Sequence, residues 1–165
     1  MKKSSRAEHT SEHKRRHRLT FLKDIAARGV DYENNSRIRP KEYIDNMSVC
    51  MAAADLIISR SGANSLSELE AMGRASILIP SPNVAGNHQY HNAMVLGKAG
   101  AAIVIEEKNL SGEVLIDCVK KLYNDADKLN CFAKRAAALY VPFISFCSQS
   151  ELTGCGVCRV LLIEE

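Results

Sequence analysis

Short apolar runs alternate with longer amphipathic stretches along most of the chain. The runs at residues 56–59, 76–79 and 101–105 predict buried strands, because each is short and bounded by turn residues. The stretches with apolar side chains at helical spacing predict helices at 47–54, 65–72, 88–99, 111–123 and 126–140. Strands alternating with helices of this length predict an α/β fold, with a parallel Rossmann-like sheet and helices on both faces.

The two ends of the chain carry weaker signals. Residues 19–27 predict a short helix that ends at Gly29, and residues 36–39 predict a short strand before Pro40. Asp45 or Asn46 is expected to cap the helix at 47–54. Residues 141–165 fit no further strand and helix unit, so this tail stays unassigned.

Composition narrows the class of protein. The chain has 165 residues, which indicates one domain, and 46% of them are apolar. A net charge of +3 is too small to indicate nucleic-acid binding by the whole chain. Basic side chains gather in residues 1–18, however. We expect this arm to be disordered, with an anionic membrane surface as a partner that it can contact.

Cysteine and histidine usage predicts no metal site and no cofactor. No apolar run is long enough for a membrane span or a signal peptide, so we expect a cytoplasmic chain with reduced cysteines, at most peripheral on the inner face of the membrane. Cys155 and Cys158 form a lone Cys-x-x-Cys near Cys147, which is a weak metal signal. His88 and His91 are three residues apart but have no further ligands nearby in sequence.

The turn at residues 60–64 is the strongest candidate for binding chemistry. It joins the strand at 56–59 to a helix that is expected to start near Ser65. The N-terminus of a helix offers unpaired N–H groups and partial positive charge, which suit a diphosphate. Gly62 and Ala63 keep the turn small, and Ser61, Asn64 and Ser65 add short side-chain donors.

Glu68 has two interpretations. Its carboxylate, expected in the first turn of this helix, can accept hydrogen bonds from both hydroxyls of a ribose. Ser65-Leu66-Ser67-Glu68 also matches a capping box, in which Glu68 bonds the Ser65 N–H instead. Spacing alone favours the cap.

The polar loop at residues 79–92 is a second candidate. It follows the next strand and leads into another helix, so its amide and imidazole groups are expected beside the first turn. They can grip the hydroxyls of a sugar. Alternatively, Asn87 caps the helix, and His88 and His91 are merely exposed.

An ordered series of motifs resembles the C-terminal half of the MurG family, best over residues 43–110. The motifs are Tyr-Ile-Asp-Asn-Met at 43–47, Ala-Ala-Ala-Asp-Leu-Ile-Ile-Ser-Arg-Ser-Gly-Ala at 52–63, Ser-Glu at 67–68, Ile-Leu-Ile-Pro-Ser-Pro at 77–82, Asn-His-Gln at 87–89, Asn-Ala at 92–93 and Gly-Ala-Ala at 100–102. The family completes lipid II in peptidoglycan synthesis with a two-domain GT-B fold, whose C-terminal domain binds UDP-N-acetylglucosamine.

The resemblance implies a role for each matched residue. Ile44 would meet the uracil, Ala63 to Ser65 the diphosphate, and Glu68 the ribose, against the capping interpretation. Gln89 would contact the N-acetylglucosamine and Arg60 would support the turn. The full predicted substrate-binding set is Ile44, Arg60, Ser61, Gly62, Ala63, Asn64, Ser65, Leu66, Ser67, Glu68, His88 and Gln89.

The resemblance also implies what is missing. The family's N-terminal domain, with its proposed base, has no counterpart here, and neither does the first strand of the C-terminal domain. We therefore expect residues 19–140 to be a partial GT-B C-terminal domain, with no catalytic residue of its own and little transfer alone. The alternatives are a donor-binding subunit that pairs with a separate acceptor-domain chain, a truncated product with an exposed sheet edge, and another enzyme of this fold such as a UDP-N-acetylglucosamine 2-epimerase.

Overall fold

The structure is a computed structural model that describes residues 27, 29, 31, 33–41, 44–140 and 160–163. Its chain divides into two compact units, Met1–Asp45 and Asn46–Glu165, and each is described by itself. The basic arm at 1–18, the helix predicted at 19–27 apart from Ala27, and the cysteines of the tail lie outside the described residues.

Residues 36 and 37 of the first unit form a turn, and residues 38 and 39 have no regular secondary structure, so the strand predicted at 36–39 is wrong. The Ile38 N–H donates to the Asn35 carbonyl at 3.0 Å, and the Asn34 N–H donates to the Asp31 carboxylate at 3.0 Å. Short polar side chains of this kind bond nearby backbone and favour turns over extended chain.

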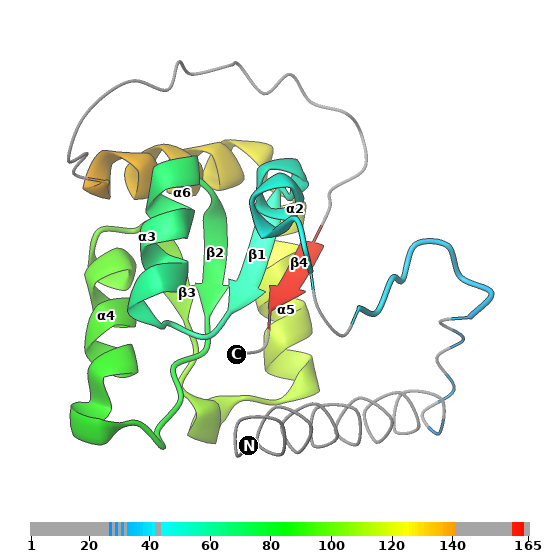
Figure 1. Ribbon diagram of the computed structural model, residues 1–165, viewed down its shortest axis with the longest axis horizontal. Coiled ribbons are helices and arrows are strands. Elements are labelled where there is room, and N and C mark those ends of the chain that lie inside the picture. Colours follow the sequence, from blue (N-terminus) through cyan, green and yellow to red (C-terminus); the bar gives the residue numbers. More distant parts are fainter. Residues whose placement is uncertain are drawn as a thin grey trace, which may run out of the picture. The chain divides into compact units, whose positions relative to one another are not determined.

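A four-stranded sheet, wholly parallel, forms the centre of the second unit (Figure 1). Its strands are β1 (Leu56–Ser59), β2 (Ala75–Leu78), β3 (Ala102–Val104) and β4 (Val160–Ile163), in the order β3-β2-β1-β4. The three strands predicted from apolar runs are confirmed, with ends shifted by at most one residue. The predicted α/β class with a parallel sheet is confirmed as well.

Strand β4 was not predicted, and it comes from the tail. It pairs with the edge of β1 that faces away from β2, with Leu56 opposite Val160 and Ser59 opposite Ile163. Leu161 and Ile163 pack on the core, whereas Val160 and Leu162 remain 46% and 49% exposed. The expected open edge of β1 is therefore occupied by the chain's own tail.

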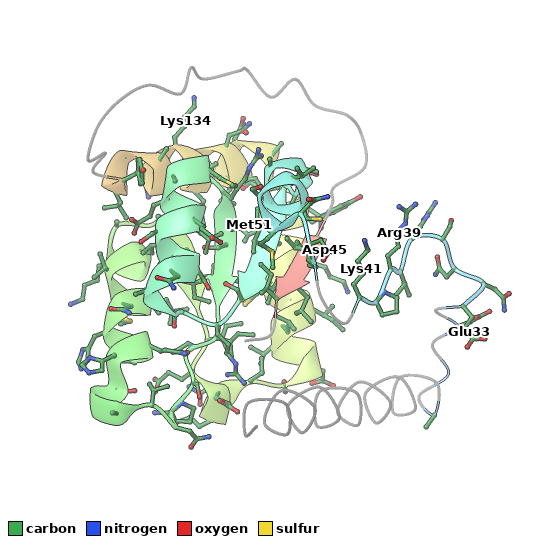
Figure 2. The ribbon with its side chains drawn as sticks, viewed as in Figure 1. Glu33, Arg39, Lys41, Asp45, Met51 and Lys134 are labelled. Atoms are coloured by element: carbon green, nitrogen blue, oxygen red, sulfur yellow. The ribbon has the colours of Figure 1, made fainter. Side chains whose placement is uncertain are left out.

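Helices cover both faces of the sheet, as predicted (Figure 1). On one face, α2 (Met47–Ala53), α3 (Ala63–Met72) and α4 (His88–Lys98) pack on alternate strand residues such as Ile57 and Leu78. On the other face, α5 (Gly112–Tyr123) and the first half of α6 (Ala126–Leu139) pack on Leu56 and Ile77. Met51 of α2 is one of the core residues on the first of these faces, whereas Lys134 of α6 extends into solvent (Figure 2).

The helix ends show which local signals were correct. Gly73 ends α3 in the left-handed region with φ 56°, and its N–H bonds the Glu70 carbonyl, as predicted from its position. Ser111 and Asp125 cap α5 and α6 through their side chains. Asn46 occupies the N-cap of α2 but makes no side-chain capping bond. Two short 3₁₀ turns, η1 (Ala85–Asn87) and η2 (Glu107–Asn109), lie in the loops after β2 and β3.

Candidate functional site

The carboxyl ends of β1, β2 and β3 meet at one edge of the sheet. Ser59 lies opposite Leu78, and Leu78 lies opposite Val104. Backbone bonds continue past the strands, since the Ile79 N–H donates to the Ser59 carbonyl and the Ile105 N–H to the Leu78 carbonyl, each at 2.9 Å. The three following loops therefore start side by side, where open α/β sheets bind their ligands.

The N-terminus of α3 stands open at this edge. The N-cap is Gly62, which has no side chain to bond the first turn, and the first helical bond runs from the Leu66 N–H to the Gly62 carbonyl at 3.1 Å. Ala63 and Asn64 are exposed, and their N–H groups have no partner among the described residues. Unpaired N–H groups at the positive end of a ten-residue helix suit an anion.

The predicted capping box is wrong, because the helix starts two residues earlier than its sequence suggested. Ser65 is the third residue of α3 and not its N-cap, and Glu68 lies in the second turn instead of the first. Glu68 is exposed and lies on the same face of the helix as Asn64, four residues before it. Its carboxylate therefore stands about one helical turn below the open N–H groups.

Ser61 is buried completely, and its hydroxyl is used inside the protein. The Oγ donates to the backbone carbonyl of Gln89 at 2.8 Å. Gln89 is the second residue of α4, so this bond joins the turn after β1 to the start of α4. The role of this side chain is to hold two loops together, which differs from the direct donation expected from the sequence.

Arg60 connects three loops. Its Nη1 donates to the carbonyl of Ile79 at 3.3 Å and to the Glu107 carboxylate at 2.9 Å. Ile79 follows β2, and Glu107 opens η2 after β3. These contacts favour the supporting role expected for Arg60. Glu106 immediately precedes this 3₁₀ turn, and its carboxylate accepts a hydrogen bond from Lys108 and raises the pKa of that ammonium group.

The loop before α4 presents the remaining polar groups. Gln89 accepts the Ser81 N–H on its side-chain oxygen at 2.8 Å, which leaves its amide N–H groups without a partner in the described part of the chain. Asn87 occupies the N-cap of α4 with φ 52° but forms no side-chain capping bond. The exposed imidazole of His88 lies against Gly86, where an added Cβ would come within 3.0 Å of its Nε2.

The second unit contains all of the predicted site residues except Ile44, which belongs to the first unit. The Leu66 side chain is buried in the hydrophobic core, so it differs from the binding role expected from the sequence. Sequence reasoning missed Glu107, and it placed Ser81 in a candidate loop without assigning it a contact. Both follow strands that end at this edge, so the carboxyl-end rule could have pointed to them. No group of three metal-ligating side chains occurs within the described residues, and no helix among them is long and apolar enough to cross a membrane.

The fold is that of an open parallel α/β domain, and the N-terminus of α3 lies at the carboxyl ends of its strands. More particularly, the chain belongs to glycosyltransferase family 28, whose C-terminal domain profile matches residues 8–144. The resemblance drawn from the motifs is therefore confirmed, and the matched part is a C-terminal domain of the MurG type.

Similar proteins carry one shared name. The UDP-N-acetylglucosamine--N-acetylmuramyl-(pentapeptide) pyrophosphoryl-undecaprenol N-acetylglucosamine transferase of Halothermothrix orenii is 41% identical over 122 residues, which are 74% of this chain and 33% of that protein. The transferase of that name from Acetivibrio thermocellus is 50% identical over 97 residues, or 59% of this chain and 26% of that protein. The chain thus spans a third or less of their length.

A solved structure agrees with these relatives. The crystal structure of Acinetobacter baumannii MurG is similar with a TM-score of 0.55 and 31% sequence identity. The match covers 59% of this chain and 28% of that one. Both the fold and the sequence therefore relate this chain to the same kind of enzyme.

Proposed function

We propose that this chain binds UDP-N-acetylglucosamine at the carboxyl edge of its sheet, as the donor half of an inverting N-acetylglucosaminyltransferase of peptidoglycan synthesis. The observation that carries the proposal is the N-terminus of α3. Ala63 and Asn64 are exposed there, and the N-cap residue, Gly62, has no side chain to bond their N–H groups. The diphosphate occupies this terminus.

Other predicted residues are assigned to the remaining parts of the donor molecule. Glu68, one turn along α3, binds the ribose hydroxyls. Gln89 uses its free amide N–H groups on the N-acetylglucosamine, while its oxygen stays on Ser81. His88 lies beside it at the start of α4.

In transfer, an acceptor hydroxyl displaces UDP from the anomeric carbon of the sugar. Negative charge grows on the leaving diphosphate, and the N–H groups at the N-terminus of α3 stabilise it. A base must take the proton of the acceptor hydroxyl. We assign that base, and the site for the N-acetylmuramyl-(pentapeptide) pyrophosphoryl-undecaprenol acceptor, to a part of the enzyme other than the described residues. This assignment is supported by the third or less of the relatives' length that the chain spans.

Calorimetric titration with UDP-N-acetylglucosamine tests donor binding. Glu68→Ala removes two charge-assisted hydrogen bonds, so we expect its dissociation constant to rise about tenfold to a hundredfold. Glu113→Ala, an exposed carboxylate in the first turn of α5, is the matched control and should bind like the unchanged chain. Equal affinity of the Glu68 and Glu113 variants would remove Glu68 from the site, and no binding by the unchanged chain would refute donor binding.

A second candidate function follows from the short coverage of the relatives. The chain can serve as a donor-binding subunit that works with a separate, membrane-bound acceptor-domain chain. Both versions predict no sugar transfer by the purified chain alone, so turnover of donor and acceptor by this chain would contradict both. Co-purification of an acceptor-domain protein from membranes, with transfer restored in the complex, would favour the two-chain version.

A further inference from the structure

The ion pair between Arg60 and Glu107 joins the candidate donor site to a loop that none of the site assignments includes. Their side chains are 29% and 38% exposed, so the pair is partly shielded from water, and Nη1 of Arg60 lies 2.9 Å from Oε2 of Glu107. Arg60 precedes the N-cap of α3 by two residues, while Glu107 is 47 residues away along the chain. Because Glu107 is distant along the chain, a change at this residue can affect the turn at 60–62 only through contacts between side chains.

We propose that Glu107 is a positioning residue for the donor site, acting through Arg60 on the turn that holds the diphosphate. The proposal rests on the proposed function. Nη1 of the guanidinium donates both to the Glu107 carboxylate at 2.9 Å and to the Ile79 carbonyl at 3.3 Å. Charge-assisted bonds to a planar guanidinium set its direction, and here they set the start of the turn that leads into Gly62.

The direction in which binding of the diphosphate changes when Glu107 is replaced distinguishes a positioning role from a simple effect of its charge. Glu107 is an anion near a site for an anion, so its charge alone disfavours a diphosphate. Removing that charge would then tighten binding. A positioning role predicts the opposite, because without Glu107 the Arg60 side chain and the turn lose their fixed geometry. Weaker binding after charge removal thus has no purely electrostatic explanation.

The neighbouring Glu106 provides a matched control. It lies on the same loop and pairs with Lys108 at 2.9 Å, and it makes no bond to Arg60. The experiment compares Glu107→Gln, Glu106→Gln, Arg60→Gln and the Arg60→Gln/Glu107→Gln double variant in calorimetric titrations with UDP. We expect Glu107→Gln to bind about fivefold more weakly, in the upper range for a partly exposed pair. Glu106→Gln should bind as well as the unchanged chain or slightly better.

The double variant tests whether Glu107 acts through Arg60. If it does, the double variant binds UDP like Arg60→Gln alone, and the two single effects do not add. Additive effects, or binding by Glu107→Gln that is equal to or tighter than that of the unchanged chain, would overturn the inference and leave the proposed function standing. Melting temperatures of the variants show whether a loss of binding reflects unfolding.

A measurement without ligand keeps the two proposals distinguishable. In ¹⁵N–¹H spectra of the free chain, Glu107→Gln should shift the amide signals of Ser61 to Asn64, and Glu106→Gln should not. If the unchanged chain fails to bind UDP, the proposed function fails, and these spectra decide on the coupling. Unmoved signals in Glu107→Gln would overturn it, whereas shifts confined to that variant would support it.

Discussion

Replacing Ser61 with alanine removes the single hydroxyl that ties the turn before α3 to the start of α4. The Oγ is wholly buried and donates to the Gln89 carbonyl at 2.8 Å. The loss of such a bond costs about 1 kcal/mol net, and about 1–3 kcal/mol where a buried partner stays unsatisfied. The volume removed is one oxygen atom, so a cavity adds little. We therefore expect a destabilisation of about 1–2 kcal/mol, or a melting temperature about 2–8 °C lower in a chain of this size.

Ser48→Ala is the control for Ser61→Ala, because it removes a serine hydroxyl from an exposed position of α2, outside the candidate site. Alanine has the higher helix propensity, so this change should leave stability unchanged or slightly raised. Urea unfolding followed by circular dichroism measures both variants. Donor affinity should also fall in Ser61→Ala alone, since α4 carries Gln89. If the two variants have equal stability and equal affinity, the bond between Ser61 and Gln89 does not hold the two loops together.

Three further predictions concern the site and its scaffold. Gln89→Glu keeps an oxygen for the Ser81 N–H but replaces the free amide donor with a negative charge, so we expect unchanged melting and donor binding about tenfold weaker by calorimetry. Gly97→Ala would place a Cβ 2.9 Å from Val104 Cγ2 and should lower the melting temperature. In Gly112→Ala the new Cβ meets nothing within 4 Å, so helix propensity of up to about 1 kcal/mol should raise the melting temperature. A higher melting temperature for Gly97→Ala than for Gly112→Ala would contradict this packing. Burial raises the pKa of Glu70 above 4.5, so the ionised form of this side chain opposes folding. Glu70→Gln should therefore raise the melting temperature at pH 7. This gain in melting temperature should vanish as the pH falls below 4.5, where the carboxyl group is protonated.

The order of elements was predictable because each one carries its own local pattern. The runs at β1 and β2 are buried on both faces and bounded by turn residues, and Gly73 marks the end of α3 by its need for a positive φ. Strand β4 has an equally apolar sequence, but it lies outside the regular alternation of strands and helices, so nothing local indicates that it pairs with a strand about a hundred residues earlier. Pairing of that kind depends on the whole sheet.

The loops of the candidate site were predictable, but the contacts between them were not. Helix α3 begins at Ala63 because Gly62 serves as N-cap, although Ser65 has the stronger intrinsic preference for that position. This shift moved Glu68 to the second turn. Arg60 and Ser61 were identified from motifs, yet their partners, Glu107 and the Gln89 carbonyl, lie 47 and 28 residues away. Sequence spacing does not reveal such contacts.

Mapping of amide signals during titration with UDP-N-acetylglucosamine tests the central claim most directly. The account predicts saturable ¹⁵N–¹H shifts at Ala63, Asn64 and Ser65, where the helix N-terminus meets the diphosphate, and at Glu68 and Gln89, with a much smaller response in Glu68→Ala. Saturable shifts at other residues that leave the N-terminus of α3 unmoved, or no saturable shift at all, would contradict it.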